Sequence, residues 1–125
     1  MYTAQKTESH LKAKGRIVLV PFPFDDFSVQ KVRPALCLSE PIGKFEHIVV
    51  AFISSKIPDQ LEESDILIDP SDSDWSATGL LAVSVLRIHK VVAIPQSLIL
   101  RELGAFPVKK EELLGRKIKS IFHLK

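Results

Sequence analysis

Residues 32–39 read ValArgProAlaLeuCysLeuSer, a charged and polar start that turns into an apolar run. The part from Pro34 to Ser39 is typical of a short buried strand. Strand-like runs recur along the chain, at residues 16–22, 47–54, 65–69 and 80–94. Several short strands joined by polar loops and followed by one late helix predict a small, strongly curved antiparallel sheet or half-barrel.

Proline and polar residues set the expected ends of these strands. Pro21 and Pro23 are expected to stop the first strand, because each removes a backbone donor and fixes φ. Residues 25–32 are too polar for the core and are predicted to form a loop. A second loop is expected at 70–79, where Trp75 needs an apolar surface to pack on.

For two segments, the sequence allows two alternative structures. Residues 1–14 show no clear period and are interpreted as a frayed tail or a short helix. Residues 95–104 fit either one helical turn closed by Gly104 or a turn followed by a short strand. The predicted organisation is therefore an N-terminal tail, 1–14, and one domain, 15–125.

The C-terminus carries an amphipathic pattern. Leu114, Ile118, Ile121 and Phe122 recur at helical spacing after a start rich in glutamate. We expect a C-terminal helix that covers one face or end of the sheet.

Composition limits the functional classes. The 125 residues suffice for one domain, and no apolar run approaches the about 20 residues that a membrane helix needs. The net charge of +2 permits nucleic-acid binding without requiring it. The single cysteine, Cys37, excludes an internal disulfide and suits a reducing cytoplasm, and the start of the chain lacks the apolar centre of a signal peptide.

Several kinds of chemistry lack their motifs. The four histidines have no metal-ligand spacing with one another or with Cys37, and the five glycines form no phosphate-binding loop. The acidic pairs at 25–26 and 71–74 are explained by loop solvation and turn capping. Neither a metal nor another cofactor is predicted.

Two junctions between a loop and a strand remain, at residues 31–34 and 52–58. If the two strands are neighbours, Arg33, Ser54 and Ser55 converge on one spot. A guanidinium beside hydroxyls binds phosphate well, because it offers a planar fork of donors next to neutral ones. The alternative is a structural ion pair between Arg33 and Asp25 or Asp26.

Basic and aromatic residues flank these junctions. Lys31 and Lys56 could contact a nucleic-acid backbone, and Phe24 and Phe27 could stack on bases. On this hypothesis the ligand is a polynucleotide.

The same segments resemble a known family. GlyArgIleValLeuValProPheProPheAspAspPheSer (15–28), LysValArgProAlaLeuCysLeuSer (31–39) and HisIleValValAlaPheIleSerSerLysIlePro (47–58) are similar to the MazF/PemK-type toxin endoribonucleases. ThrGlyLeu (78–80), SerValLeuArgIleHisLys (84–90) and ArgGluLeuGly (101–104) add to the resemblance. The similarity runs from Gly15 to the C-terminal helix.

The resemblance implies a fold and a function. The expected fold is α+β but mainly β, an SH3-like curved antiparallel half-barrel with a C-terminal amphipathic helix, assembled as a homodimer. The expected activity is metal-independent cleavage of single-stranded RNA, restrained by a cognate antitoxin protein.

The family's catalytic arginine and threonine fall on Arg33 and Ser54. The substrate-binding residues expected around these two are Phe24, Asp26, Lys31, Ser55 and Lys56. Asp25 and Asp26 are the candidate proton acceptors, since Arg33 is always charged and is a poor base.

Two positions depart from the family pattern. Arg16 follows Gly15 where the family usually has aspartate, so a local acidic contact is lost or reversed. Ser54 replaces threonine, which keeps the hydroxyl but removes the γ-methyl that restricts its rotamer. These departures leave open a second hypothesis, a non-catalytic relative that binds nucleic acid or protein. A third hypothesis is a plain structural β-domain with Arg33 in an ion pair.

Overall fold

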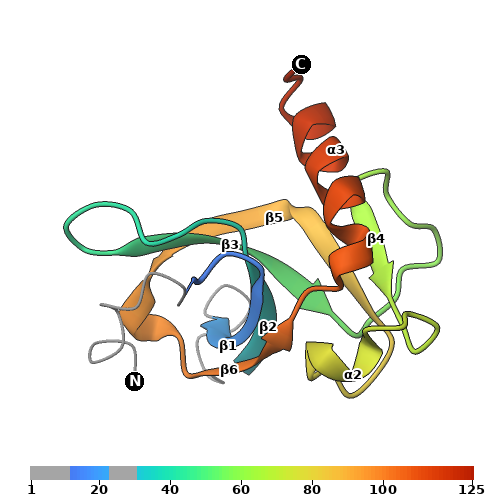
Figure 1. Cartoon of the computed structure of the whole chain (residues 1–125), viewed down its shortest axis with the longest axis horizontal. Coiled ribbons are helices and arrows are strands. Elements are labelled where there is room, and N and C mark those ends of the chain that lie inside the picture. Colours follow the sequence, from blue (N-terminus) through green and yellow to red (C-terminus); the bar gives the residue numbers. More distant parts are fainter. Residues whose placement is uncertain (1–11, 23–30) are drawn as a thin grey trace.

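A computed structural model describes residues 12–22 and 31–125 (Figure 1). Six strands, two α-helices and two short 3-10 helices follow one another along these residues. They are β1 (Arg16–Phe22), β2 (Lys31–Cys37), β3 (His47–Ser54), β4 (Asp65–Ile68), α2 (Trp75–Thr78), β5 (Ser84–Pro95), η1 (Gln96–Leu98), β6 (Arg101–Ala105), η2 (Val108–Lys110) and α3 (Glu111–Ile121).

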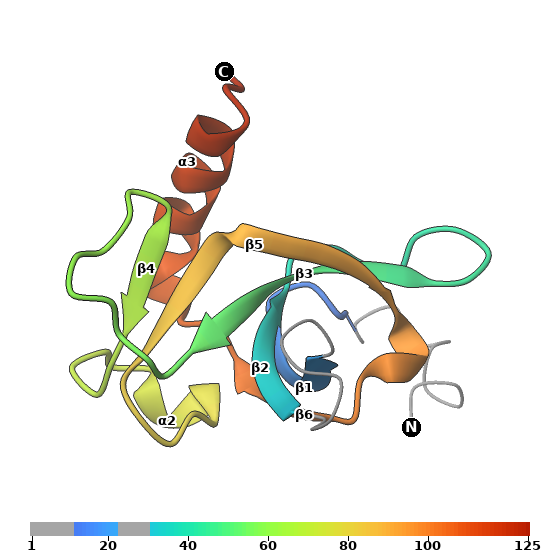
Figure 2. The ribbon, with the colours of Figure 1, turned by 180° about the vertical axis from the view of Figure 1, so that it is seen from behind.

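The strands form a single antiparallel sheet in the order β4-β5-β3-β2-β1-β6. The sheet curls on itself, so that β1, β2 and β6 close one end while β4 and the first half of β5 form the other (Figure 2). The strand β5 bends sharply near its middle, where its register against β3 shifts between Ala51 and Ile53. The predicted fold, a curved antiparallel half-barrel with a C-terminal helix, is confirmed.

The two faces of the sheet carry two separate apolar clusters, because successive side chains of a strand point to opposite faces. One cluster contains buried residues of all six strands except β6, among them Ile17, Leu36, Ile53 and Leu86. The other lies within the curl of β1, β2 and β3, and its buried members are Ala13, Val18, Val20, Ala35, Cys37, Ile48, Val50, Phe52 and Ile94. We call this second set the inner cluster.

The first strand has its expected bounds, 16–22, although Pro21 does not stop it, and the start of the second strand was expected too late, at Pro34. β1 continues through Pro21 to Phe22, and β2 begins at Lys31, inside the predicted loop, and runs through Pro34. Both prolines lie where their strand has a ladder on one side only: β6 pairs with residues 16–19 of β1, and β3 pairs with β2 from Ala35 onward. A missing N–H is tolerated there, because no partner on that side requires it.

Other strand boundaries also differ from the expected ones. β2 ends at Cys37 rather than Ser39, β4 ends at Ile68, and β5 covers 84–95 instead of 80–94. The predicted loop at 70–79 contains the short helix α2, whose Trp75 is half-buried against the first cluster, as its need for an apolar surface predicts. Of the two alternatives for 95–104, a turn followed by a strand is correct, with η1 as the turn and β6 as the strand.

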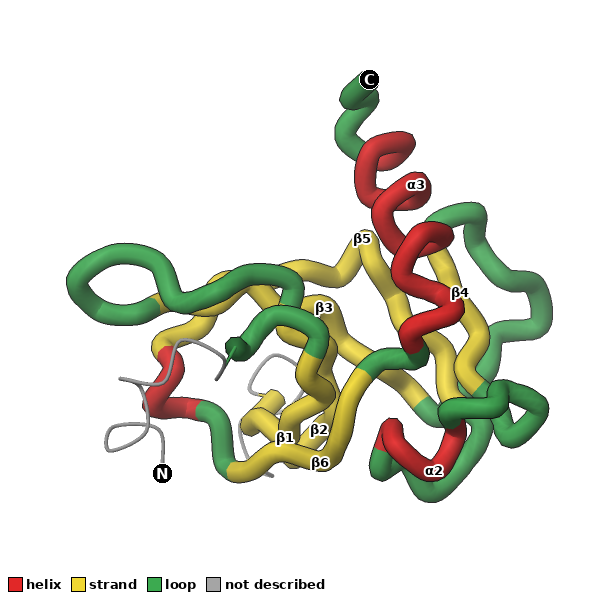
Figure 3. Tube along the Cα trace, viewed as in Figure 1, coloured by secondary structure: helices red, strands yellow, loops and turns green. Residues whose placement is uncertain are grey.

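The helix α3 lies beside β4 at one end of the sheet, and its C-terminal end extends away from the strands (Figure 3). Leu113, Leu114, Ile118 and Ile121 pack against the first cluster, which confirms the amphipathic pattern. Phe122 does not belong to that face: it follows the helix and is 56% exposed.

The start of the described chain is packed. Ala13 is 3% exposed within the inner cluster, and its backbone N–H donates to Oε1 of Glu40 at 2.8 Å. Residues 1–11 of the predicted tail lie outside the described residues, so the division at residue 15 stays a prediction. In the described part of the chain, no helix is long and apolar enough to cross a membrane.

Candidate active site

Arg33 and Ser54 lie at neighbouring strand ends. β2 and β3 are antiparallel with Ala35 opposite Phe52, and continuing this register by two residues sets Arg33 opposite Ser54. The other neighbours are Val20 of β1, which pairs with Arg33, and Val85 of β5, which pairs with Ser54. The condition on which the sequence hypothesis depended, that the two strands are adjacent, is met.

The two side chains also share a face of the sheet. Arg33 continues the alternation of Ala35 and Cys37, and Ser54 continues that of Val50 and Phe52. All four of these apolar residues belong to the inner cluster. Arg33 and Ser54 thus lie on the same face of the sheet as the inner cluster, at its edge. Both side chains are half-buried.

Part of the Arg33 side chain is buried. The Nε atom of Arg33 is buried, so the base of the guanidinium is held within the protein rather than in solvent. Such a side chain loses less conformational entropy when it binds an anion than a freely rotating one would.

The chain bends directly after Ser54, and the bend engages its hydroxyl. The backbone N–H of Lys56 donates to Ser54 Oγ at 3.0 Å, while the hydroxyl donates to the Lys56 carbonyl oxygen over a long 3.4 Å. This is a serine turn, in which a hydroxyl bonds the backbone two residues on. The oxygen is firmly held, whereas the proton is only weakly engaged.

The remaining predicted residues divide into two groups. Lys31, Ser55 and Lys56 are exposed at the same strand ends as Arg33 and Ser54. Phe24 and Asp26, with the further candidates Asp25 and Phe27, lie outside the described residues.

The sequence hypothesis included Lys56 for its charge and missed its backbone N–H. The signal was present, because a hydroxyl residue at a strand end, two residues before a backbone N–H in the following loop, favours this turn. Only the structure places the donor on Ser54 itself.

Arg16, one of the two positions that differ from the family pattern, forms an ion pair. Arg16 Nη2 lies 2.5 Å from Glu102 Oε2, across the β1–β6 pair. Both side chains are about 40% exposed, at 42% and 40%, so the pair contributes at most about 1 kcal/mol. The basic residue at position 16 thus faces an acidic residue on β6.

A second polar cluster lies elsewhere, around Asp65 at the start of β4. Asp65 is 4% exposed; its Oδ1 accepts from Arg87 Nε at 2.8 Å and its Oδ2 accepts from the backbone N–H of Glu62 at the same distance. His89 Nδ1 lies 2.8 Å from Ser64 Oγ. These bonds tie the loop before β4 to β5, which is a structural role.

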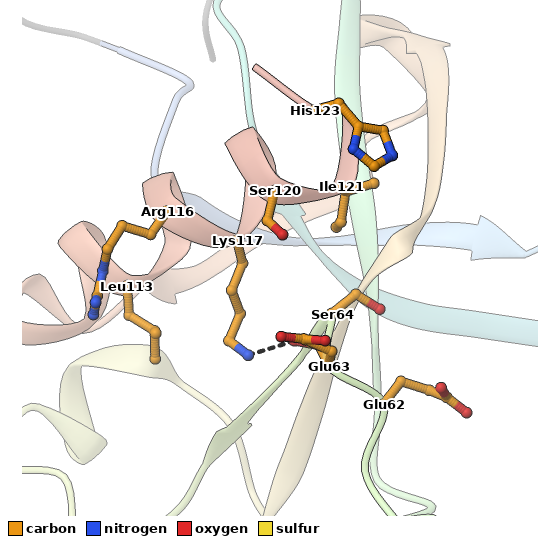
Figure 4. A pocket seen from close by; sticks show the side chains of 9 residues that line it. All are labelled: Glu62, Glu63, Ser64, Leu113, Arg116, Lys117, Ser120, Ile121 and His123. Carbon is orange, nitrogen blue, oxygen red and sulfur yellow. Dashed lines mark hydrogen bonds between the residues drawn. The ribbon is translucent and has the colours of Figure 1, made fainter. Parts of the chain in front are cut away.

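A groove of about 490 Å³ lies between that loop and α3 (Figure 4). Lys117 reaches across it to the backbone carbonyl of Glu63. None of the predicted site residues lines this groove; its walls are Glu62, Glu63, Ser64, Leu113, Arg116, Lys117, Ser120, Ile121 and His123. Acidic and basic side chains are mixed in this lining.

No group of three or more His, Cys, Asp or Glu side chains in the ranges 12–22 and 31–125 could hold a metal ion. Asp25 and Asp26 lie outside these ranges and are not covered by that statement.

Comparison with known proteins points to one family. Residues 13–122 match the family model described as PemK-like, MazF-like toxin of type II toxin-antitoxin system. Among solved structures, the Mycobacterium tuberculosis toxin MazF-mt6 is similar, with a TM-score of 0.67 and 21% sequence identity over 88% of this chain and 98% of that chain. At that identity the likeness shows the fold alone. Curated proteins give no match.

Proposed function

Because this chain belongs to the PemK-like, MazF-like toxins of type II toxin-antitoxin systems, we propose that it is an endoribonuclease that cleaves single-stranded RNA without a metal. The observation that carries the proposal is the placement of Arg33 and Ser54 on one face of two adjacent strand ends. The catalytic domain on this proposal is 15–125, and the molecule acts in the cytoplasm.

The reaction uses a nucleophile that RNA carries itself. The 2′-hydroxyl attacks the adjacent phosphorus, the P–O5′ bond breaks, and the products are a 2′,3′-cyclic phosphate and a 5′-hydroxyl. One proton leaves the 2′-oxygen and one arrives at the departing 5′-oxygen, so no net acid or base is consumed. The protein needs to supply charge stabilisation and proton transfer only.

Arg33 and Ser54 suit the stabilising part. Negative charge grows on the non-bridging phosphoryl oxygens in the transition state, and donors placed there lower the barrier. Arg33 offers two parallel N–H groups and a permanent charge, and Ser54 offers its weakly engaged hydroxyl proton. Lys31, Ser55 and Lys56 bind the flanking RNA, together with Phe24 and Asp26; Asp25 and Asp26 remain the candidate proton acceptors.

Two protein partners complete the proposal. A cognate antitoxin binds over Arg33 and its neighbouring loops, and protection of residues 25–33 and 54–58 from hydrogen exchange in the complex is the expected signature. A second copy of the chain forms a homodimer, which sedimentation at micromolar concentration tests against a 14.0 kDa monomer.

The deciding experiment incubates the protein with a long RNA in EDTA. Mapped cut sites are then rebuilt with a single 2′-deoxy sugar at the attacking position. We expect cleavage in EDTA, a cyclic phosphate on the product, and no cleavage of the deoxy copies. Cutting of a deoxy substrate, or a strict need for divalent metal, contradicts the mechanism.

A non-catalytic binding relative is the second candidate, because Ser54 and Arg16 depart from the family pattern. It predicts RNA or protein binding with no cleavage of any RNA. The same incubation, read beside a binding assay, separates the two.

A further inference from the structure

The loss of threonine at position 54 removes a restriction on the side chain that delivers the hydroxyl. A threonine is held at χ1 by its γ-methyl, whereas a serine samples three staggered rotamers more freely. A hydroxyl that donates to a transition state has to point one way. Something other than a methyl group must therefore orient Ser54 in this chain.

We propose that the backbone N–H of Lys56 is the positioning group that holds the Ser54 hydroxyl in its donating orientation, an inference that rests on the proposed function. The N–H donates to Oγ at 3.0 Å, an ordinary hydrogen bond. It uses one acceptor site of the oxygen and leaves the proton outside the bond. Lys56 acts through Ser54 and need not touch the reacting atoms in this role.

The hydroxyl proton is available because its present acceptor is poor. The Lys56 carbonyl oxygen lies 3.4 Å from Oγ, which is longer than an ordinary bond from an O–H donor. A phosphoryl oxygen that approaches to an ordinary distance is a better acceptor, since it is charged. The proton turns to the substrate while the N–H keeps Oγ in place.

The structure holds both residues of this hydrogen bond, Ser54 and Lys56, in place. Ser54 is half-buried and paired with Val85 of β5, which fixes its backbone. Lys56 is exposed just beyond the strand, so its side chain is free to contact RNA while its N–H faces back to Oγ. Lys56 thus has two separate roles: its side-chain ammonium group binds RNA, and its backbone amide positions the Ser54 hydroxyl.

The kinetic test removes the amide and the ammonium separately. Lys56→Pro deletes the N–H, and Lys56→Ala keeps it but deletes the charge. We expect Lys56→Pro to lower kcat on a single-stranded RNA about tenfold, the worth of one net hydrogen bond. Lys56→Ala should act mainly through KM, because it loses a phosphate contact.

Rescue by threonine distinguishes positioning from general disruption. In the Ser54→Thr background the γ-methyl restricts χ1 by itself, so Lys56→Pro should cost clearly less than it does beside serine. An equal loss of kcat in both backgrounds, or equal effects of Lys56→Pro and Lys56→Ala, overturns the proposal. An ester in place of the 55–56 amide removes the same hydrogen without the proline ring, should Lys56→Pro fail to fold.

A measurement without RNA keeps this inference apart from the proposed function. The Lys56 amide should exchange its hydrogen slowly in the parent and faster in Ser54→Ala, with the neighbouring strand amides unchanged. If no RNA is cleaved but this protection holds, the proposed function fails and the positioning bond stands. If Ser54→Ala leaves the Lys56 amide unaffected, the bond is absent and the inference fails.

Discussion

The carbonyl oxygen of Leu103 lies 2.1 Å from the point that a Cβ atom on Gly79 would occupy. Gly79 closes α2 with a φ of +75°, in the left-handed region, and packs against β6. The contact is matched from the other side, because a Cβ on Gly104 would lie 2.2 Å from the Ala77 carbonyl oxygen. The ThrGlyLeu and ArgGluLeuGly segments of the family resemblance are therefore one structural contact between α2 and β6.

Gly79→Ala should destabilise the fold, because it meets a backbone atom and forces a strained φ. We expect a loss of about 2–4 kcal/mol in the free energy of unfolding. Urea titration followed by the fluorescence of Trp75, the single tryptophan, which packs on the first cluster, measures it.

Gly115→Ala is the matched control. Gly115 lies inside α3 with nothing within 4 Å of its Cβ position. Alanine there should stabilise by about 0.5–1 kcal/mol. Equal effects of the two substitutions would contradict the contact.

Arg33→Ala should lower the rate of RNA cleavage by about 100- to 1,000-fold, by analogy with the loss of an oxyanion donor. Arg33→Lys should recover little, since the charge stays but the planar fork is lost. Single-turnover cleavage in EDTA measures both, and an unimpaired Arg33→Ala would remove Arg33 from the mechanism.

Ser54→Ala should impair cleavage and Ser54→Thr should preserve or raise it. Alanine removes the donor, whereas threonine retains it and adds the rotamer restriction. The comparison is made on the same RNA under saturating conditions. Cleavage by Ser54→Ala as fast as that by the parent would show that the hydroxyl of residue 54 does not act on the substrate.

The sequence predicted the fold through its alternation and its apolar runs. Patterns such as HisIleValValAlaPheIleSer specify a buried strand over their whole length, and β3 covers these residues, 47–54. The start of β2 was placed at Pro34 rather than Lys31, because whether a strand continues on both sides of a proline depends on which neighbouring strand reaches that far. That is a property of the assembled sheet.

The candidate site, too, was predicted only in part from the sequence. Residue types and strand ends indicated Arg33 and Ser54, but their adjacency depends on β2 and β3 being neighbours in register. The serine turn at Lys56 and the Arg16–Glu102 pair depend on side-chain geometry and on β6, a strand whose existence the sequence left open. Local patterns do not contain such distances.

Cys37 should resist thiol reagents in the folded protein. It is 1% exposed, and burial, helped by the charges of Glu40 and Glu102 against a smaller effect of Arg16, raises the pKa of its thiol from 9.0 to about 12. A thiol-specific chromogenic reagent at pH 8 should react only after unfolding, because the thiolate is the reactive form. Rapid reaction of the native protein would contradict the burial of this residue.

The same shift links stability to alkaline pH. The folded state keeps the proton that the unfolded state releases above pH 9, so the free energy of unfolding should fall between pH 9 and about 12. Below pH 9 both states hold the proton, and this group adds no pH dependence. Cys37→Ala, which has no proton to lose, should show a smaller decline over that interval in urea titrations.

The hydrogen bond from Lys110 to the edge strand β4 is expected to limit aggregation. β4 is an edge strand, and edge strands present unpaired backbone groups that can template pairing with another molecule. Here Lys110 Nζ donates to the Leu67 carbonyl oxygen at 2.6 Å and pairs with Asp72 at 3.1 Å, which places a charge on that edge. Lys110→Ala should raise light scattering in concentrated solution, whereas Lys109→Ala, at an exposed neighbour, should not. On this prediction, the Lys110 ammonium group limits self-association of the folded chain through the edge strand β4.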